Sequence, residues 1–275
     1  MNHDAPIAIR WTIGDVSRRG FEALRLSIWG AWRLFGPSAS YVVCVNTIPL
    51  PPAQLLTGEI PDSVTWHAST PNQLPEFVRP HLDDSMVEGV GWKFAPLRLF
   101  PEHHELALDN DCILWEMPTA IRHWLAHAHD ETCVIAQDVR PAFGQFARFC
   151  RSTPCNSGIR GLPPRFDFAR RLRSLLEAHP VRLTSELDEQ GLQVAAVSRS
   201  REPLMVGVDE VSICSPFPPH QPHLGTCGAH FVGLNARKLP WALGGRPAHE
   251  HIREHWEKHR DTLYQRVGIS PLAEA

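Results

Sequence analysis

Short apolar runs alternate with helical periodicities along the first part of the chain. Residues 7–13 and 41–45 are apolar runs that contain β-branched side chains, which is typical of strands buried on both faces. Between them, apolar side chains recur at helical spacing over residues 16–35, and Gly36 and Pro37 end that helix. Strands separated by helices predict a largely parallel, buried sheet.

The same patterns assign the rest of the chain. Further strands are expected at residues 64–67, 105–108, 113–114, 132–136, 194–197 and within 204–213. Helices are expected at residues 87–100, 121–128, 168–176 (opened by Asp167 as N-cap) and 247–266. The proline-rich stretches 49–61 and 215–222 are expected to be irregular. Because no internal repeat or long linker interrupts the pattern, residues 1–275 are expected to form one domain.

Composition and charge narrow the class of protein. The chain has 275 residues with 43% hydrophobic side chains, which is ordinary globular composition. A net charge of −3 with scattered Lys and Arg argues against nucleic acid as the main partner. No stretch approaches the ~20 apolar residues of a transmembrane segment, and Met1 to Arg10 does not resemble a secretory signal. We therefore expect a cytoplasmic protein.

The cysteines agree with that location. Their number, seven, is odd, and no two have C-x-x-C spacing. Four of them, Cys44, Cys112, Cys133 and Cys214, lie in apolar runs, where a free cysteine behaves as a small hydrophobe. Reduced thiols are therefore expected rather than disulfides or a zinc site.

The most informative segment is the strand that ends in Asp109 and Asp111. Ligands of open α/β sheets gather at the carboxyl ends of the strands, and buried carboxylates are costly unless a positive charge meets them. A divalent cation that also bridges phosphate oxygens would meet that need. An acidic turn that caps the following helix is the alternative, because Asp-x-Asp alone is common by chance.

A second group of polar residues lies late in the chain. It offers an imidazole at His230, a flexible Gly233 and a cation at Lys238, followed by Pro240 and Trp241. Two carboxylates with an imidazole favour Mn²⁺, with Mg²⁺ as the alternative. An ammonium can stabilise a departing diphosphate. Taken alone, His230 and Lys238 would be interpreted as ordinary loop residues.

Together these segments resemble the GT-A glycosyltransferases, most closely family 8, the group of glycogenin and the bacterial lipopolysaccharide galactosyltransferases. Leu108 to Asp111 matches the leucine-aspartate-x-aspartate strand end of that family. The segment from His230 to Trp241 resembles its His-x-x-Gly-x-x-Lys-Pro-Trp motif. Leu239 separates Lys238 from Pro240, so Arg237 is an alternative for the lysine role.

Two further segments resemble the family in the same order along the chain. Asn156, Ser157 and Gly158 match its Asn-Ser/Ala-Gly turn, which contacts the donor sugar. Asp188 and Glu189 lie in a segment similar to Asp-Gln-Asp-x-Leu-Asn, with Glu189 where glutamine is usual, and the resemblance makes them the catalytic candidates.

Residues nearer the amino terminus complete the resemblance. Arg98, in the basic and aromatic segment from Lys93 to Phe100, is expected to touch the donor phosphate or sugar. Thr12 and Ile13 occupy the place where the family binds the nucleoside. Residues 1–115 would then form the nucleotide-sugar-binding half, and residues 116–275 the sugar and acceptor half with the C-terminal helix.

The resemblance implies an α/β GT-A fold with a mixed, mostly parallel sheet flanked by helices. It implies transfer of a hexose from a nucleoside diphosphate sugar, most often a UDP-sugar, to a hydroxyl acceptor such as a saccharide, with retention. Asp109, Asp111 and His230 would hold the metal. The alternatives are a nucleotidyltransferase of related fold, which Gly14 to Gly20 is too poor in glycine to suit, and a catalytically idle nucleotide-sugar-binding protein.

The C-terminal helix offers a rival metal site. Histidines stand there at positions 249, 251, 255 and 259, and the pair His251 and His255 lies one turn apart. Such pairs can bind zinc. Without an H-E-x-x-H motif they are more often surface residues, and that is the interpretation we prefer from sequence.

Overall fold

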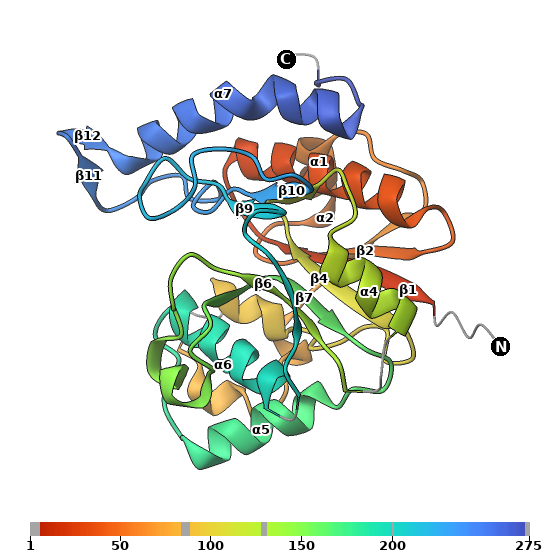
Figure 1. Cartoon of the computed structure of the whole chain (residues 1–275), viewed down its shortest axis with the longest axis vertical. Helices are drawn as coiled ribbons and strands as arrows, with labels where there is room; N and C mark the ends of the chain where they lie inside the picture. Colours follow the sequence, from red (N-terminus) through yellow and green to blue (C-terminus); the bar gives the residue numbers. More distant parts are fainter. Residues whose placement is uncertain (1–5, 84–88, 128–130, 200, 273–275) are drawn as a thin grey trace.

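A computed structural model describes residues 6–83, 89–127, 131–199 and 201–272. Its centre is a seven-stranded sheet with the order β3-β2-β1-β4-β7-β6-β8 (Figure 1). The strands are β1 (Ile7–Ile13), β2 (Ser40–Val45), β3 (Val64–Ala68), β4 (His104–Asp109), β6 (Val134–Gln137), β7 (Cys155–Leu162) and β8 (Leu204–Val206). This mixed α/β architecture confirms the predicted fold class.

Most neighbouring strands of the sheet are parallel, and β7 is the exception. β1 pairs in parallel with β2 and β4, so that Thr12 lies between Cys44 and Asp109. β7 runs antiparallel to both β4 and β6. The carboxyl end of β4 therefore lies beside the beginning of β7, and residues from both strands meet at one edge of the sheet.

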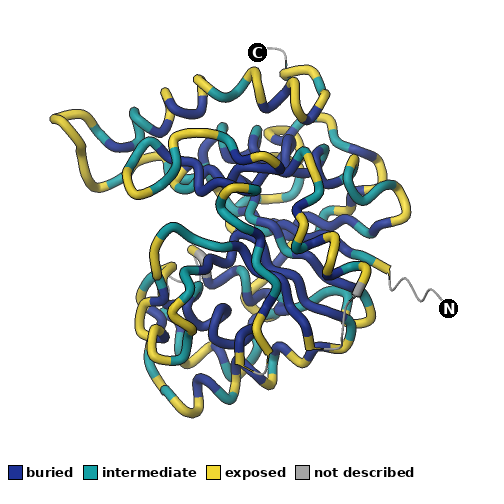
Figure 2. Tube along the Cα trace, in the orientation of Figure 1, coloured by how far each residue is buried: buried dark blue, intermediate teal, exposed yellow. Residues whose placement is uncertain are grey.

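Helices cover both faces of the sheet. On one face pack α1 (Arg18–Phe35), α2 (Leu50–Thr57) and α4 (Thr119–His127), and on the other α5 (Phe168–Ala178) and α6 (Glu186–Ser198). Side chains alternate along the strands: Val134 and Ala136 face the first layer, whereas Ile135 faces the second. The dark blue tube in Figure 2 shows that the strands themselves are buried.

Short elements connect these layers and extend the molecule. Four 3-10 helices are described: η1 (Pro71–Gln73), η2 (Arg79–His81), η3 (Val90–Phe94) and η4 (Gly144–Phe149). A small sheet has the order β5-β10-β9, from Cys112–Leu114, Gly228–His230 and Val211–Ile213. The hairpin β11–β12 (Ala242–Leu243 and Arg246–Pro247) precedes α7 (Ala248–Val267), which packs on α1 and β10 (Figure 1).

The structure confirms most of the expected elements. Asp167 caps α5 as expected, its side chain accepting from the amide of Arg170. The segment 215–222 is a loop, as expected. All seven cysteines are free, and the four assigned to apolar runs are buried. The expectations for residues 1–5, 87, 88 and 128 lie outside the described residues.

Three of the secondary-structure assignments expected from sequence were wrong. Residues 50–57 form a helix, because Pro51 and Pro52 stand in its first turn, where the backbone amide needs no partner. Residues 194–197 lie in α6 rather than in a strand: residues 191–198 are all buried, so this part of the helix shows no polar face. In the segment 89–100 only η3 is helical. Among the described helices, none is long and apolar enough to cross a membrane.

Candidate active site

The two carboxylates of the Asp-x-Asp segment lie at the carboxyl end of β4. Asp109 is the last residue of the strand, beside Thr12 of β1, and Asp111 stands in the tight turn to β5. Asp111 is 3% exposed, whereas the Asp109 side chain is 25% exposed. One carboxylate is therefore anchored in the protein, and the other faces the open edge of the sheet.

His230 joins them from the other half of the chain. It ends β10, which runs antiparallel to β5 and places His230 opposite Cys112. Its Nε2 lies 3.3 Å from Asp111 Oδ1 and 3.6 Å from Asp109 Oδ2. Burial opposes the charged imidazole, but the hydrogen bond and charge of Asp111, with the charge of Asp109, outweigh it and raise the pKa of His230.

Gly158 makes room for this imidazole. A Cβ atom at Gly158 would lie 2.4 Å from Cε1 and 2.6 Å from Nδ1 of His230. The Asn156 side chain shapes the same stretch of β7: it accepts from the Gly158 amide at 2.9 Å and donates to the Gln137 carbonyl at 3.1 Å. The expected turn at residues 156–158 is in fact the beginning of this strand, so Gly158 is required by close packing rather than by a turn.

An asparagine pair fixes the turn between the carboxylates. Asn110 and Asn235 exchange two side-chain hydrogen bonds of 2.7 and 3.0 Å. Asn235 also donates to Asp111 Oδ2 at 3.2 Å. The loop after β10 thus reaches back 124 residues to hold Asp111 in place.

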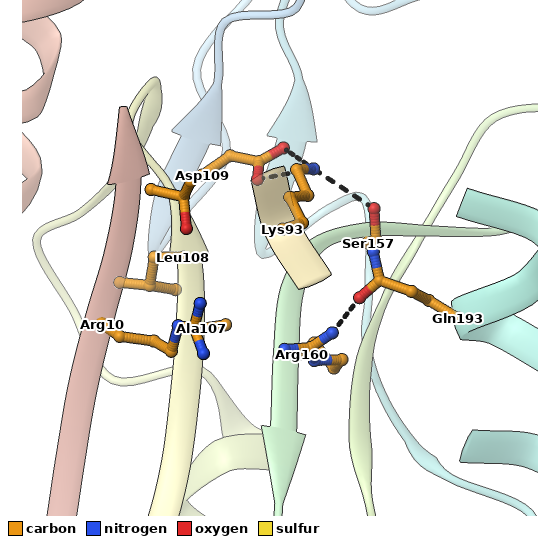
Figure 3. A pocket seen from close by; sticks show the side chains of 9 residues that line it. Arg10, Lys93, Ala107, Leu108, Asp109, Ser157, Arg160 and Gln193 are labelled. Carbon is orange, nitrogen blue, oxygen red and sulfur yellow. Dashed lines mark hydrogen bonds and ion pairs between the residues drawn. The ribbon is translucent and has the colours of Figure 1, made fainter. Parts of the chain in front are cut away.

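Lys93 of η3 supplies a positive charge at the same edge. Its Nζ lies 2.8 and 3.0 Å from the two oxygens of Asp109 and 3.4 Å from Ser157 Oγ (Figure 3). Burial disfavours the ammonium, but Asp109, Glu189 and Asp111 together raise the pKa of Lys93. Lys93 is therefore charged at every physiological pH.

Glu189 is the third carboxylate near Lys93. It lies in the first turn of α6 and is 1% exposed, with one oxygen 4.0 Å from Lys93 Nζ and the other without a hydrogen-bond partner among the described residues. Burial raises the pKa of Glu189 to about 7, against the effect of Lys93 and with that of Asp109. Near neutral pH it can therefore hold or release a proton.

The donor set fits a divalent cation. One ligand atom each of Asp109, Asp111 and His230 lies within 4.8 Å of the others. The two aspartates and Glu189 carry up to three negative charges, which the ammonium of Lys93 and the guanidinium of Arg160 only partly balance. Carboxylates with one imidazole are a ligand set that Mn²⁺ accepts.

A pocket of about 300 Å³ opens beside this cluster. Thr12 and Ile13 at the end of β1 line it, together with Asp109 and Lys93. Trp92 supplies an aromatic wall, and Asn235 a polar one. The expected nucleoside-binding residues thus border the same pocket as Asp109. A smaller cavity of about 20 Å³ lies deeper, lined by Lys93, Asp109, Ser157 and Arg160 among others (Figure 3).

Two of the expected site residues point elsewhere. Asp188 accepts four hydrogen bonds of 2.8 to 3.1 Å from Gln145 and Thr184, so its oxygens tie α6 to η4 and to the residues that precede α6. Arg98 donates to the carbonyls of His103, Pro163 and Phe166, near the amino end of β4. The structure does not bring either side chain to the cluster.

In the segment after His230, Arg237 rather than the expected Lys238 contacts a residue of the pocket. Gly233 has a φ of 85°, which favours glycine. Lys238 is exposed, whereas Arg237 forms an ion pair with Asp15, a residue that lines the pocket. Arg237 is therefore the cation of this segment with a described contact at the pocket.

Sequence reasoning did not single out Lys93 and Asn235. Lys93 belongs to the basic and aromatic segment from Lys93 to Phe100. It lies between Trp92 and Phe94, which are both buried. This was a usable signal, because a lysine among buried aromatic side chains needs a partner. Asn235 gave no local signal, since its role depends on a contact with a residue 125 positions away.

Comparisons with known proteins agree with the fold. No protein-family model matches the chain, and no curated protein matches it. A solved structure of the galactosyltransferase LgtC, in complex with donor and acceptor sugar analogues, aligns with a TM-score of 0.57 at 11% identity, covering 97% of this chain and 98% of that chain. The chain has the GT-A glycosyltransferase fold. A structure of an LgtC active-site mutant with glutamine changed to glutamate aligns with a TM-score of 0.54 at 11% identity, covering 91% of this chain and 95% of that chain.

Proposed function

We propose that this protein is a glycosyltransferase that moves a hexose from a nucleoside diphosphate sugar, with a UDP-sugar as the expected donor, to a hydroxyl acceptor such as a saccharide. One observation carries the proposal: Asp109, Asp111 and His230 converge at the carboxyl end of β4, and Asp109 also lines a pocket that reaches the end of β1. In open α/β sheets this is where nucleotides bind.

The cluster would hold a divalent cation, Mn²⁺ first and Mg²⁺ as the alternative. When bound, the cation supplies positive charge for the two phosphates of the donor. Asp111 is fixed by Asn235, and His230 by its packing on Gly158, so two of the three ligands are held in position before the metal arrives. Asp109, the more exposed one, would exchange part of its contact with Lys93 for the metal.

The pocket beside Thr12 and Ile13 suits the nucleoside. Its volume of about 300 Å³ lies at the lower end of the range for small-molecule sites. Trp92 offers an aromatic surface for a base, and Asn235 offers amide hydrogen-bonding groups. The donor would then extend from this pocket across Asp109 toward Ser157.

Lys93, Ser157 and Glu189 would surround the sugar. A retaining transfer needs a polar group beneath the anomeric carbon, and Glu189 is the buried carboxylate next to Lys93. LgtC was studied with a glutamate in place of an active-site glutamine, the substitution that Glu189 represents in our comparison with family 8. A carboxylate there can act as a nucleophile, which glutamine does poorly.

A cation that meets the leaving diphosphate is the next part of the proposed site. We assign Lys238 to this role. Arg237 is its rival, because Arg237 already borders the pocket through its ion pair with Asp15. Separate alanine substitutions of the two residues decide between them. Loss of a group that meets growing charge lowers turnover more than donor affinity, by about 2.7–4 kcal/mol in the activation free energy.

The experiment is a donor screen with purified protein and Mn²⁺. UDP release from a panel of UDP-hexoses is measured with and without saccharide acceptors, and NMR determines the anomeric configuration of the product. Release that depends on Mn²⁺ and on one donor, with the donor's configuration kept in the product, supports the proposal. Donor binding without release of UDP would identify an idle binding protein. Release of pyrophosphate from a nucleoside triphosphate would identify a nucleotidyltransferase. An inverted product would refute retention.

A further inference from the structure

A second group of metal-ligating side chains lies outside the candidate active site. Cys214 follows β9, and His255 and His259 lie one turn apart on α7. Cys214 Sγ is 3.3 Å from His255 Nε2, and one ligand atom of each of the three residues lies within 4.8 Å of the others. We call these three residues the Cys-His cluster. It differs from the sequence expectation, which considered His251 with His255 and did not include a cysteine.

The spacing of the ligand atoms suits a tetrahedral metal. Zinc binds thiolate sulfur at about 2.3 Å and imidazole nitrogen at about 2.0–2.1 Å, so sulfur and nitrogen on one tetrahedral zinc are about 3.5 Å apart. The observed 3.3 Å between Cys214 and His255 is close to that value. A thiolate with two imidazoles and no carboxylate prefers zinc to Mn²⁺ or Mg²⁺.

The surroundings are those of a built site rather than a surface histidine pair. Cys214 is 1% and His255 8% exposed, and the ring of Phe231 lies 6.2 Å from each imidazole, between centroids. Nε2 of His259 lies 3.1 Å from the Pro222 carbonyl, a contact of the kind that orients metal-binding imidazoles.

We propose that Cys214, His255 and His259 bind one zinc ion, with water as the fourth ligand. On binding, the Cys214 thiol loses its proton to solvent and the sulfur forms the bond to zinc. The ion would join α7 to the end of β9. Because the Cys214 amide donates to the His230 carbonyl at 2.8 Å, the ion would also brace the strand that carries His230. The zinc site is independent of the proposed reaction, and its test needs no donor or acceptor.

Cobalt is the probe, because Co²⁺ replaces zinc and a thiolate ligand gives it a charge-transfer absorption in the near ultraviolet. The candidate active site contains no thiol among its three ligands, so this band reports the Cys-His cluster alone. The full chain is titrated with Co²⁺ and then with Zn²⁺, and the zinc content of protein purified without added metal or chelator is measured. The variants are Cys214→Ser, His255→Gln and His259→Gln. The controls are Cys227→Ser, a buried cysteine elsewhere, and His251→Gln on the same helix.

We expect the thiolate band of the unaltered chain to saturate at one equivalent of Co²⁺ in the Cys-His cluster. The band should disappear when zinc is added. Cys214→Ser should abolish the band, both histidine variants should weaken Co²⁺ binding at least ten-fold, and both controls should keep it. Circular dichroism of the metal-free variants shows whether each folds. If Cys214→Ser does not fold, His259→Gln is the test variant, because His259 is partly exposed. Absence of the band in the unaltered chain at a ten-fold excess of Co²⁺, or its survival in folded Cys214→Ser, would overturn the proposal.

Discussion

At the scale of single residues, the environment of Glu189 combines burial with an incomplete set of partners. Its side chain is 1% exposed, Lys93 lies 4.0 Å away, and the charge of Arg160 also acts on it. Burial raises the pKa of Glu189 from 4.5 to about 7, so the folded protein binds a proton that the unfolded chain releases. Ionisation of Glu189 therefore costs the wild-type protein stability as the pH rises from about 4.5 to about 7.

Glu189→Gln removes this cost. We expect the variant to match the wild type near pH 4.5 and to exceed its free energy of unfolding at pH 8 by on the order of 3 kcal/mol. Denaturant unfolding of the metal-free proteins at several pH values measures the difference. A difference that stays constant with pH would show that Glu189 does not titrate as described. In the donor screen the variant should keep measurable transfer, since it restores the residue usual in family 8.

Asp188, the neighbour of Glu189, is expected to behave differently. Its burial is offset by hydrogen bonds from Gln145 and Thr184, which lower its pKa. Asp188→Ala should lower the free energy of unfolding by roughly 3 kcal/mol, because several bonds to a charged acceptor are lost. This contribution is present above the ordinary pKa and disappears as the pH falls through the folded value.

The milder variant Asp188→Asn separates structure from catalysis. It keeps one acceptor oxygen, so the protein should fold and retain turnover per folded molecule. A well-folded Asp188→Asn that binds donor without turning it over would return Asp188 to the catalytic role that the family resemblance implies.

At the scale of elements, β7 positions the imidazole of His230. Gly158→Ala would place a methyl group within 2.4 Å of that ring, so we expect the ring to move. The affinity for UDP in the presence of Mn²⁺ should then fall at least ten-fold, and with it the stabilisation by UDP. Gly207→Ala is the matched control, because its nearest atom, Gln137 Oε1, lies 3.8 Å away. Melting curves with UDP and Mn²⁺ measure the effect. Equal stabilisation of both variants would contradict the placement of His230.

Local patterns predicted the central strands from their apolar runs, and most helices from the difference in burial between their faces. The strand ending in Asp109 was recognisable because two acids interrupt an apolar run. α6 was partly misassigned because residues 191–198 are all buried, so this part of the helix has no polar face. Gly191 approaches the Phe143 carbonyl so closely that a Cβ would lie 2.0 Å from it, and no sequence pattern reports such a contact.

At the scale of the whole molecule, one carboxylate of α1 binds polar side chains of α7, in addition to the apolar packing between the two helices. Glu22 accepts from Trp256, Arg260 and Tyr264 at 3.1, 2.7 and 2.8 Å. Glu22→Ala leaves these donors without their acceptor, so we expect a loss of about 2–4 kcal/mol of stability. Hydrogen exchange should become faster in α7 while β1 and β2 keep their protection. Uniform change across the chain would show that α7 does not open separately.

The site depends on contacts that join distant parts of the chain. The Asp pair and His230 could be proposed from sequence because each belongs to a motif with fixed order. The pairing of Asn110 with Asn235, and the approach of Lys93 to Asp109, arise only when the loops fold over the sheet edge. For the same reason Arg98, chosen for its charge, lies instead beside carbonyls near the other end of β4.

Calorimetric titration of UDP with and without Mn²⁺ tests the central claim most directly. The proteins are the wild type, Asp111→Asn, and Asp62→Asn as a control at an exposed position that does not line the pocket. We predict that the wild type and Asp62→Asn bind UDP at least ten-fold more tightly with Mn²⁺ than with a chelator, and that Asp111→Asn loses this difference while its fold persists. UDP binding that is unchanged by the chelator, or an undiminished Mn²⁺ effect in Asp111→Asn, would contradict a metal-dependent nucleotide site at Asp109, Asp111 and His230.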